Sequence, residues 1–186
     1  MTRAIFAILG LILLQPMVAW AISSWAINPA ESQITFRYTL NGEEREGTFH
    51  KFQATGQFSA TRPEAASLDL SVATESIDLK NTLASAYATS AEWFDSKNHP
   101  NVVFSLTKLT HLEDTAYLAE GVLSMRGAKK PITAKLNLDV AENTAFARGS
   151  LTIARRDFWL GYGPSAAVVT VSEDVVIDFN LRARIR

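Results

Sequence analysis

The chain has 186 residues, of which 47% are hydrophobic and 20% charged, so it can bury a sizeable core and is not a disordered chain. Its 18 basic and 19 acidic residues nearly balance and no basic run occurs, which argues against a protein that binds nucleic acid by electrostatic attraction. There is no cysteine, which excludes disulfides, thiolate nucleophiles and thiolate metal sites.

The chain begins with the pattern of a secretory signal, over residues 1–21. A positive residue opens it, residues 5–14 form an apolar run too short for a comfortable membrane span, and Ala19 and Ala21 are the small residues that a signal peptidase reads. We expect cleavage after Ala21, with an uncleaved N-terminal anchor as the alternative. Export would bring the protein into an oxidising compartment, where a chain without cysteine depends on its core for stability. Residues 22–186 are then expected to form one domain.

Alternation of apolar and polar residues is the main signal in this domain. It is longest in the last run, where apolar residues such as Val175, Ile177 and Phe179 occupy every second position. A period of two indicates strands with one dry and one wet face, which is typical of antiparallel sheet. Turn residues such as Asn41-Gly42 fall between the runs. Eight strands are predicted, over residues 32–41, 47–60, 66–78, 101–111, 116–126, 131–141, 145–155 and 168–184.

The predicted fold class is mainly β, an extended antiparallel eight-stranded β-barrel with one or two short helices. Closure into a barrel is favoured because long alternating strands have edges that must be hidden. The helical part is residues 79–94, where Leu83 and Tyr87 follow helical spacing and alanine recurs. Asp78 or Asn81 would cap the start of this helix.

Aromatic and charged residues gather where the helical segment meets the next strand. Trp93 and Phe94 end the segment, residues 95–99 form an exit loop, and Pro100 opens the strand, a position at which proline is tolerated. This cluster could be a catalytic site or a structural joint. We favour the joint, with the helix lying across one end of the barrel and its rings pointing inward.

Catalytic and metal-binding motifs give little support to an enzyme. The histidines His50, His99 and His111 share no motif spacing, and neither a GxSxG elbow nor a glycine-rich phosphate loop occurs. No catalytic residue, metal site or covalent cofactor is therefore predicted. One alternative is an enzyme that acts on small lipophilic substrates, with His50 as its candidate catalytic group. Another is an interaction protein whose barrel is filled solid and whose surface docks a membrane partner.

The most charge-dense patch is Arg155-Arg156-Asp157, followed by Phe158 and Trp159. A guanidinium suits the geometry of a carboxylate or a phosphate, so one arginine could pair with Asp157 or bind an anionic headgroup. We favour a surface ion pair.

Large apolar side chains are spread over the predicted strands and helix. Each of them taken singly is explained as core filling, whereas the whole set is also compatible with a lined tunnel. The sequence alone does not separate these readings. The candidate ligand-binding residues are Phe36, Phe49, Phe52, Leu83, Tyr87, Trp93, Phe94, Phe104 and Phe158.

Several short motifs occur together in a fixed order over residues 25–183. They are Trp25-Ala26-Ile27 with Ser32-x-Ile34-x-Phe36, Gly47-Thr48-Phe49-x-x-Phe52, Glu92-Trp93-Phe94-Asp95 with Pro100-x-Val102-x-Phe104, Gly121-x-Leu123-x-x-Arg126-Gly127 with Lys130-Pro131-Ile132, and Arg155-x-Asp157-Phe158-x-x-Gly161-x-Gly163. In order and spacing this set resembles the YceI-like family of bacterial periplasmic proteins, which are related in shape to lipocalins.

The resemblance implies a lipocalin-like barrel that encloses a long apolar tunnel, and it implies binding and not catalysis. The implied ligand is an isoprenoid-tailed lipid, either a quinone or a polyprenyl lipid, and the implied location is the periplasm. A membrane or a cytochrome b561-type membrane protein is the implied transient partner, and a homodimer is kept as an alternative to a monomer. Many relatives have Arg-Asp-x-His where this chain has Ala84-Ser85-Ala86-Tyr87, so a different lipid or looser binding is also expected.

Overall fold

The structure is a computed structural model, and it describes residues 23–59, 62–164 and 168–185. The expected secretory signal over residues 1–21 lies outside the described residues and stays a prediction. Among the helices of the described part, none is long and apolar enough to cross a membrane.

The described residues form an all-antiparallel sheet with a single α-helix, α1 (Thr82–Ala88). The strands are β1 (Ser23–Ile27), β2 (Gln33–Leu40), β3 (Glu43–Phe49), β4 (Phe52–Phe58), β5 (Ser67–Ala73), β6 (Ile77–Asp78), β7 (Asn101–Glu113), β8 (Ala116–Met125), β9 (Ala128–Ala141), β10 (Thr144–Ala154) and β11 (Asp174–Ile185). Among the described residues, the 3₁₀ turns that join them are η1 (Pro29–Glu31), η2 (Pro63–Ala65), η3 (Thr74–Ser76) and η4 (Arg155–Phe158).

The eleven strands amount to eight long ones, because three of the long strands are interrupted. The turn η1 separates β1 from β2, two residues separate β3 from β4, and η3 separates β5 from β6. Both parts of each interrupted strand pair with the same neighbouring long strand. β1 pairs with β4 and β2 with β3, while β4 pairs with β5 and β3 with β6. The eight strands predicted from the sequence are thereby confirmed.

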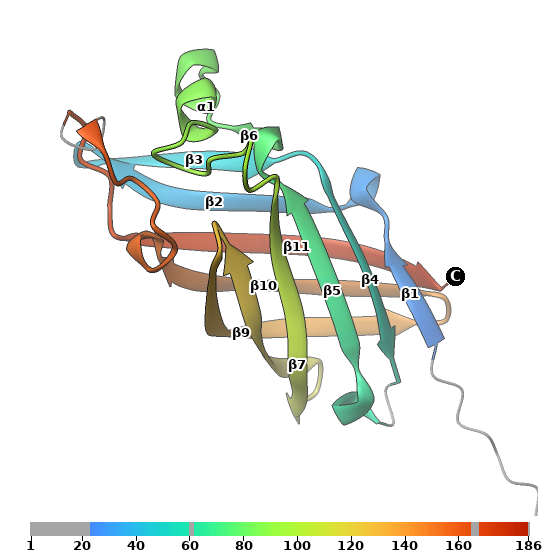
Figure 1. Ribbon diagram of the computed structural model, residues 1–186. Helices are drawn as coiled ribbons and strands as arrows, with labels where there is room; N and C mark the ends of the chain where they lie inside the picture. Colours follow the sequence, from blue (N-terminus) through green and yellow to red (C-terminus); the bar gives the residue numbers. More distant parts are fainter. Residues whose placement is uncertain (1–22, 60–61, 165–167, 186) are drawn as a thin grey trace, which may run out of the picture.

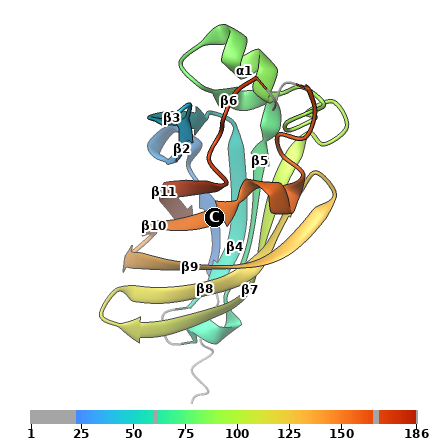
Figure 2. The same cartoon turned by 90° about the vertical axis from the view of Figure 1, so that its left-hand side faces the viewer.

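The sheet closes on itself through β11. One edge of β11 pairs with β10 along its whole length, whereas the other edge pairs with β2 at residues 176–180 and with β1 at residues 183–185. The remaining order β4-β5-β7-β8-β9-β10 completes the circle (Figures 1 and 2). A closed barrel leaves no long free edge to pair with another chain.

Two predicted strand limits were wrong. No strand is predicted at β1, because its five residues SSWAI show too little alternation to be recognised alone. The last strand was expected from residue 168 but begins at Asp174. The segment before it makes only an isolated bridge, between Leu40 and Val171.

The helix α1 lies at one end of the barrel, away from the end at which β1 begins (Figures 1 and 2). Asn81 is its N-cap, with the side-chain oxygen accepting a hydrogen bond from the Ala84 backbone N–H at 2.9 Å. One short helix, ending at Ala88, is present within the segment 79–94 in which one or two short helices are predicted, and turns follow it. Trp93 and Phe94 lie in these turns; the backbone N–H of Phe94 bonds to the Ala88 carbonyl at 2.9 Å.

A small apolar cluster packs in the other half of the barrel. Leu109, Tyr117 and Ala119 are buried there, and the Phe58 ring packs on them. The rings of Phe58 and Tyr117 meet edge to face with centroids 6.3 Å apart. The barrel interior is therefore packed at this cluster, whereas a cavity occupies the space between it and α1.

Candidate functional site

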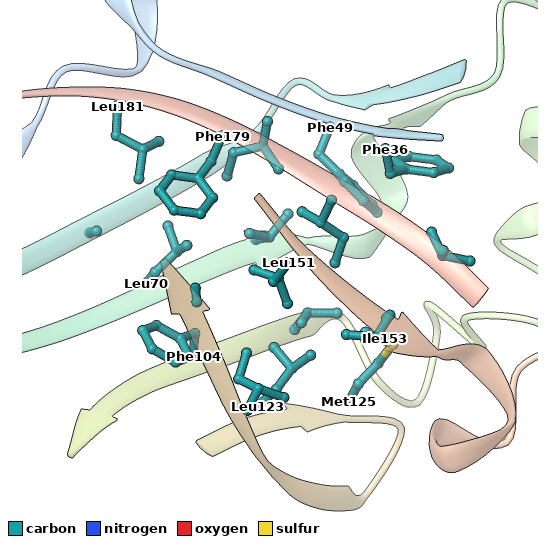
Figure 3. A pocket seen from close by; sticks show the side chains of 18 of the residues that line it. Phe36, Phe49, Leu70, Phe104, Leu123, Met125, Leu151, Ile153, Phe179 and Leu181 are labelled. Atoms are coloured by element: carbon teal, nitrogen blue, oxygen red, sulfur yellow. The ribbon is translucent and has the colours of Figure 1, made fainter. Parts of the chain in front are cut away.

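A cavity of about 840 Å³ runs through the barrel. Side chains from each of the eight long strands and from α1 line it, and Figure 3 shows Phe49, Leu70, Leu151, Phe179 and Leu181 among those that point into the common space. Its size lies in the upper part of the range typical of ligand sites, roughly 300–1,000 Å³. The prediction of a barrel with one dry inner face is confirmed, and this interior is not filled solid.

Strand alternation builds this wall. On β9, Ile132, Ala134 and Leu136 line the cavity, while the intervening Thr133 and Lys135 are exposed. Small residues widen the space where two of them face each other, as Ala119 and Ala134 do across the β8–β9 ladder. Alternation thus explains which side chains face inward, and residue size explains why they do not meet across the barrel.

Three lining phenylalanines each lie against a glycine of the neighbouring strand. The pairs are Phe36 with Gly47, Phe104 with Gly121, and Phe179 with Gly149. A Cβ added at Gly47 would overlap the Phe36 ring, and one at Gly149 would come within 2.7 Å of the Phe179 ring. The rings occupy the place of the missing side chains, so they lie along the wall and less of each ring projects into the cavity.

The polar groups of the lining are few and are not acidic. Arg45 and Arg155 are its charged residues, and no aspartate, glutamate or histidine is among the described residues that line it. Burial raises the pKa of the Tyr38 hydroxyl above its ordinary value, and the nearby Arg45 guanidinium opposes this shift. An arginine-bearing apolar wall suits a ligand whose polar end carries acceptor oxygens.

Arg155 is buried at the cavity wall, with 5% of its surface exposed. Its guanidinium donates to three backbone carbonyls, those of Ser172 at 2.9 Å, Leu160 at 2.6 Å and Val171 at 3.2 Å. It also lies over the Trp93 ring, 5.6 Å from the centroid. Burial lowers the pKa of this guanidinium from its ordinary value, although an arginine stays charged at neutral pH.

The expected surface pairing of an arginine with Asp157 was wrong. Arg155 turns inward, as described, and Arg156 pairs instead with Glu173 at 2.9 Å. Asp157 lies 3.5 Å from the Lys130 ammonium group. The reason is the turn η4, which places consecutive side chains on different sides of the chain.

Seven of the nine candidate ligand-binding residues line the cavity. They are Phe36, Phe49, Leu83, Tyr87, Trp93, Phe94 and Phe104. The rings of Phe36 and Phe49 lie 5.3 Å apart, and those of Phe49 and Phe94 5.7 Å apart, so rings from β2, β3 and the turns after α1 form one continuous series. Their role in binding stays a prediction.

The other two candidates, Phe52 and Phe158, belong to the packed core and not to the cavity lining. Phe158 is 1% exposed and Phe52 7% exposed, and both pack in the main cluster of buried residues. Sequence reasoning missed Trp25, Phe179 and Arg155, which do line the cavity. The strict alternation of the last strand could have identified Phe179, whereas no sequence pattern distinguishes Arg155 from its neighbour.

The histidines do not approach the cavity. His50 is exposed on the outside of the barrel and lies 3.2 Å from Asp78, so it does not occupy the interior position that an enzyme on this barrel would need. The pKa of Asp78 lies below its ordinary value, because the carboxylate accepts hydrogen bonds from the Lys80 backbone N–H and from His50. Within residues 23–59, 62–164 and 168–185, no three histidine, aspartate or glutamate side chains come together as metal ligands would.

Comparison with known families gives a match over nearly the whole described chain. The family model described as the YceI-like domain matches residues 25–183. This chain belongs to the YceI-like family. Two curated relatives are UPF0312 proteins. One, from Pseudomonas putida, is 25% identical over 139 residues, or 71% of each chain. The other, from Shewanella baltica, is 25% identical over 182 residues, covering 92% of this chain and 94% of the relative.

Solved structures show the same YceI-like fold. BcnA of Burkholderia cenocepacia superposes with a TM-score of 0.79 at 24% identity, covering 84% of this chain and 98% of that one. A polyisoprenoid-binding domain from Saccharophagus degradans, implicated in plant cell wall breakdown, gives a TM-score of 0.72 at 15% identity, covering 89% and 100%. The YceI protein of Campylobacter jejuni gives 0.67 at 18% identity, covering 75% and 84%. At these identities the likeness establishes the fold.

Proposed function

We propose that this YceI-like protein is a periplasmic carrier that holds one isoprenoid-tailed lipid, a quinone or a polyprenyl lipid, in its barrel cavity. The observation that carries the proposal is the cavity itself, about 840 Å³ and bounded almost entirely by aliphatic and aromatic side chains. Lining residues extend along β7 from Val102 to Leu109, which is roughly 23 Å of strand. An elongated apolar space of this length suits a chain better than a compact ligand.

The energetics favour exchange with a membrane over irreversible capture. Burying a CH₂ group is worth roughly 0.8 kcal/mol against water, so one five-carbon unit contributes up to about 4 kcal/mol. A bilayer solvates the same tail equally well, and the net preference for the protein is therefore small. A protein with this balance takes up lipid from one membrane and releases it to another. A structurally similar domain from Saccharophagus degradans, named as polyisoprenoid-binding, supports the choice of tail.

The polar end of the ligand is proposed to carry acceptor oxygens, as a quinone or a phosphate does. Arg45 and Arg155 are the charged side chains of the lining, and both can donate hydrogen bonds. An ammonium headgroup would meet the like charge of Arg155 there, whereas Arg45 is paired with Glu43. We propose binding without catalysis, because His50, the candidate for an enzymatic role, lies outside the cavity.

The test is native mass spectrometry of the protein purified gently from the cell envelope. We expect an adduct with the mass of an isoprenoid lipid, or stoichiometric uptake of ubiquinone or a polyprenol when either is added in mild detergent. A cationic lipid with the same tail is the matched comparison and should bind more weakly. A protein that carries no lipid-sized adduct and takes up neither compound would contradict the proposal. The intact mass from the same experiment tests cleavage after Ala21.

A further inference from the structure

We propose that the end of the barrel that carries α1 docks on the surface of a lipid bilayer. The docking face is defined as Leu83 and Tyr87 of α1, Trp159 and Tyr162 after η4, and Val168. The described residues include nine exposed large hydrophobic side chains, and these five are 49–82% exposed. The remaining four, Leu112, Val140, Phe146 and Ile185, are 36–49% exposed.

Hydrogen bonds bring the segments of the docking face together. The Gly161 backbone N–H donates to the Glu92 carbonyl at 2.9 Å, which joins the segment after η4 to the turns after α1. Arg126 strengthens this junction by donating to the carbonyls of Trp159 and Ala91. The rings of Trp159 and Tyr162 lie 5.6 Å apart. These contacts fix the segment that carries Trp159 and Tyr162 against the turns that follow α1.

The docking face is continuous with the cavity. Leu83, Tyr87 and Val168 are exposed to solvent and also line the interior space. An apolar ligand that enters or leaves past these residues would cross water unless the reservoir of that ligand lies against them. A bilayer is such a reservoir. This step rests on the proposed function, because it assumes a lipid cargo.

Trp159 gives an independent reason for the face. Its backbone has φ 60° and ψ 25°, in the left-handed region that disfavours side chains other than glycine. Its indole is 59% exposed. The backbone conformation ends the turn η4 as its C-cap, and the exposed side chain is the part of Trp159 that a docked bilayer would cover. Tryptophan and tyrosine are also the side chains that collect at membrane–water interfaces.

The charges near the face favour an uncharged bilayer surface. Of the basic groups near the face, Lys80 pairs with Glu46 at 3.0 Å and Arg45 pairs with Glu43, while Arg126 donates to the backbone carbonyls of Trp159 and Ala91. Docking is therefore apolar and needs little anionic lipid.

The test is flotation of the purified protein with vesicles of neutral phosphatidylcholine. Wild-type protein should float with the vesicles, with little change when phosphatidylglycerol is added or salt is raised. Leu83→Gln and Trp159→Gly should each lower the bound fraction about tenfold, since a large apolar side chain is lost from the interface. Leu112→Gln is the matched control on the other side of the molecule and should float like wild type. Trp159→Gly also relieves the left-handed strain, so its melting temperature should not fall.

Several results would overturn the docking face. These are no flotation of the wild type, equal loss for Leu112→Gln, binding that requires phosphatidylglycerol, or a dimer in sedimentation that Leu83→Gln dissociates. Failure of docking and failure of the proposed function are distinguishable. Trp159 does not line the cavity, so Trp159→Gly should still take up ubiquinone from detergent. Uptake of ubiquinone without flotation would support the proposed function and contradict the docking face. Flotation without uptake would support the docking face and contradict the proposed function.

Discussion

Single residues decide how much of the barrel interior stays open. Gly47, Gly121 and Gly149 have no side chain to fill the wall, and a phenylalanine ring from the next strand lies over each of them. A phenylalanine with an ordinary neighbour would stand away from the sheet and reach further toward the barrel axis. These pairs therefore place large aromatic surface around the cavity while taking little of its volume.

Gly47 offers the clearest test of this role. The atoms nearest to a Cβ added there belong to the side chains of Phe36 and Leu79, both of which line the cavity, so they can move only into it. We expect Gly47→Ala to reduce ubiquinone uptake and to destabilise the fold by about 1–3 kcal/mol through overpacking. Urea unfolding and native mass spectrometry measure the two effects. Adding Phe36→Leu should restore uptake, and a single variant with unchanged uptake and stability would refute the argument.

Arg155 is expected to stabilise the chain around the cavity. Its planar guanidinium reaches three carbonyls on two segments, and a lysine cannot reproduce that fork from one ammonium group. Arg155→Lys should lower the free energy of unfolding by about 2–3 kcal/mol, because buried carbonyls lose their donors. The control is Arg156→Lys, an exposed group paired with Glu173, for which a change under about 1 kcal/mol is expected. Equal urea midpoints for the two variants would rule out a special role for Arg155.

At the scale of elements, the interruptions in the strands separate the two ends of the barrel. The first long strand breaks at η1 and the third at η3, so the halves of each strand can take different directions. One half of β11 then pairs with β1 and the other half with β2. As a result, β2, β3 and β6 lie together at one end of the barrel, where α1 is found, and β1 and β4 lie toward the other end (Figure 1).

The helix α1 has seven residues, which is too short for a stable isolated helix, so its cap matters. Asn81→Ala removes the acceptor for the Ala84 N–H and should cost about 1 kcal/mol. We expect faster hydrogen exchange in residues 82–88 with unchanged protection in β7 and β8, since the loss is local. Asn81→Asp keeps an acceptor and should exchange like wild type. A uniform loss of protection across the barrel would mean that α1 is required for the whole fold.

The sequence predicted the elements well where their pattern was long. The alternation identified both β9 and β11, because each has one face in water and one in the interior, although β9 begins at Ala128 and β11 at Asp174, away from the predicted residues 131 and 168. The five residues of β1 carried no such pattern, and the helix occupies only Thr82–Ala88, after which turns bring Trp93 to the cavity lining. Period identifies the face of a strand, but not the point at which a tertiary contact ends an element.

The cavity itself is a property of the whole molecule that periodicity does not report. Alternation identified inward side chains such as Phe36, Phe49 and Phe104, yet the same pattern describes a barrel filled solid. The difference depends on distances across the barrel, which small residues such as Ala119 and Ala134 and the ring-on-glycine pairs set. The same limit of periodicity explains why Phe52 and Phe158 are predicted as ligand-binding residues although they pack in the core.

Filling the cavity tests the proposed function at the scale of the whole molecule. Ala134 is buried on the inner face of β9 and lines the open space, so a phenylalanine there points into the cavity. Ala134→Phe should abolish or strongly reduce ubiquinone uptake while stability stays the same or rises by about 1–2 kcal/mol, because added apolar surface becomes buried. Thr133→Phe makes the same addition on the exposed face one residue away and should leave uptake unchanged.

The two measurements together separate a blocked cavity from a damaged fold. If Ala134→Phe lost uptake and also lost several kcal/mol of stability, the result would report misfolding, and the smaller Ala134→Leu would then have to reproduce the loss of uptake at wild-type stability. If a stable Ala134→Phe variant bound ubiquinone as well as wild type does, the ligand would lie outside the barrel. The interior space would then have no part in carrying lipid, and the proposed function would have to be abandoned.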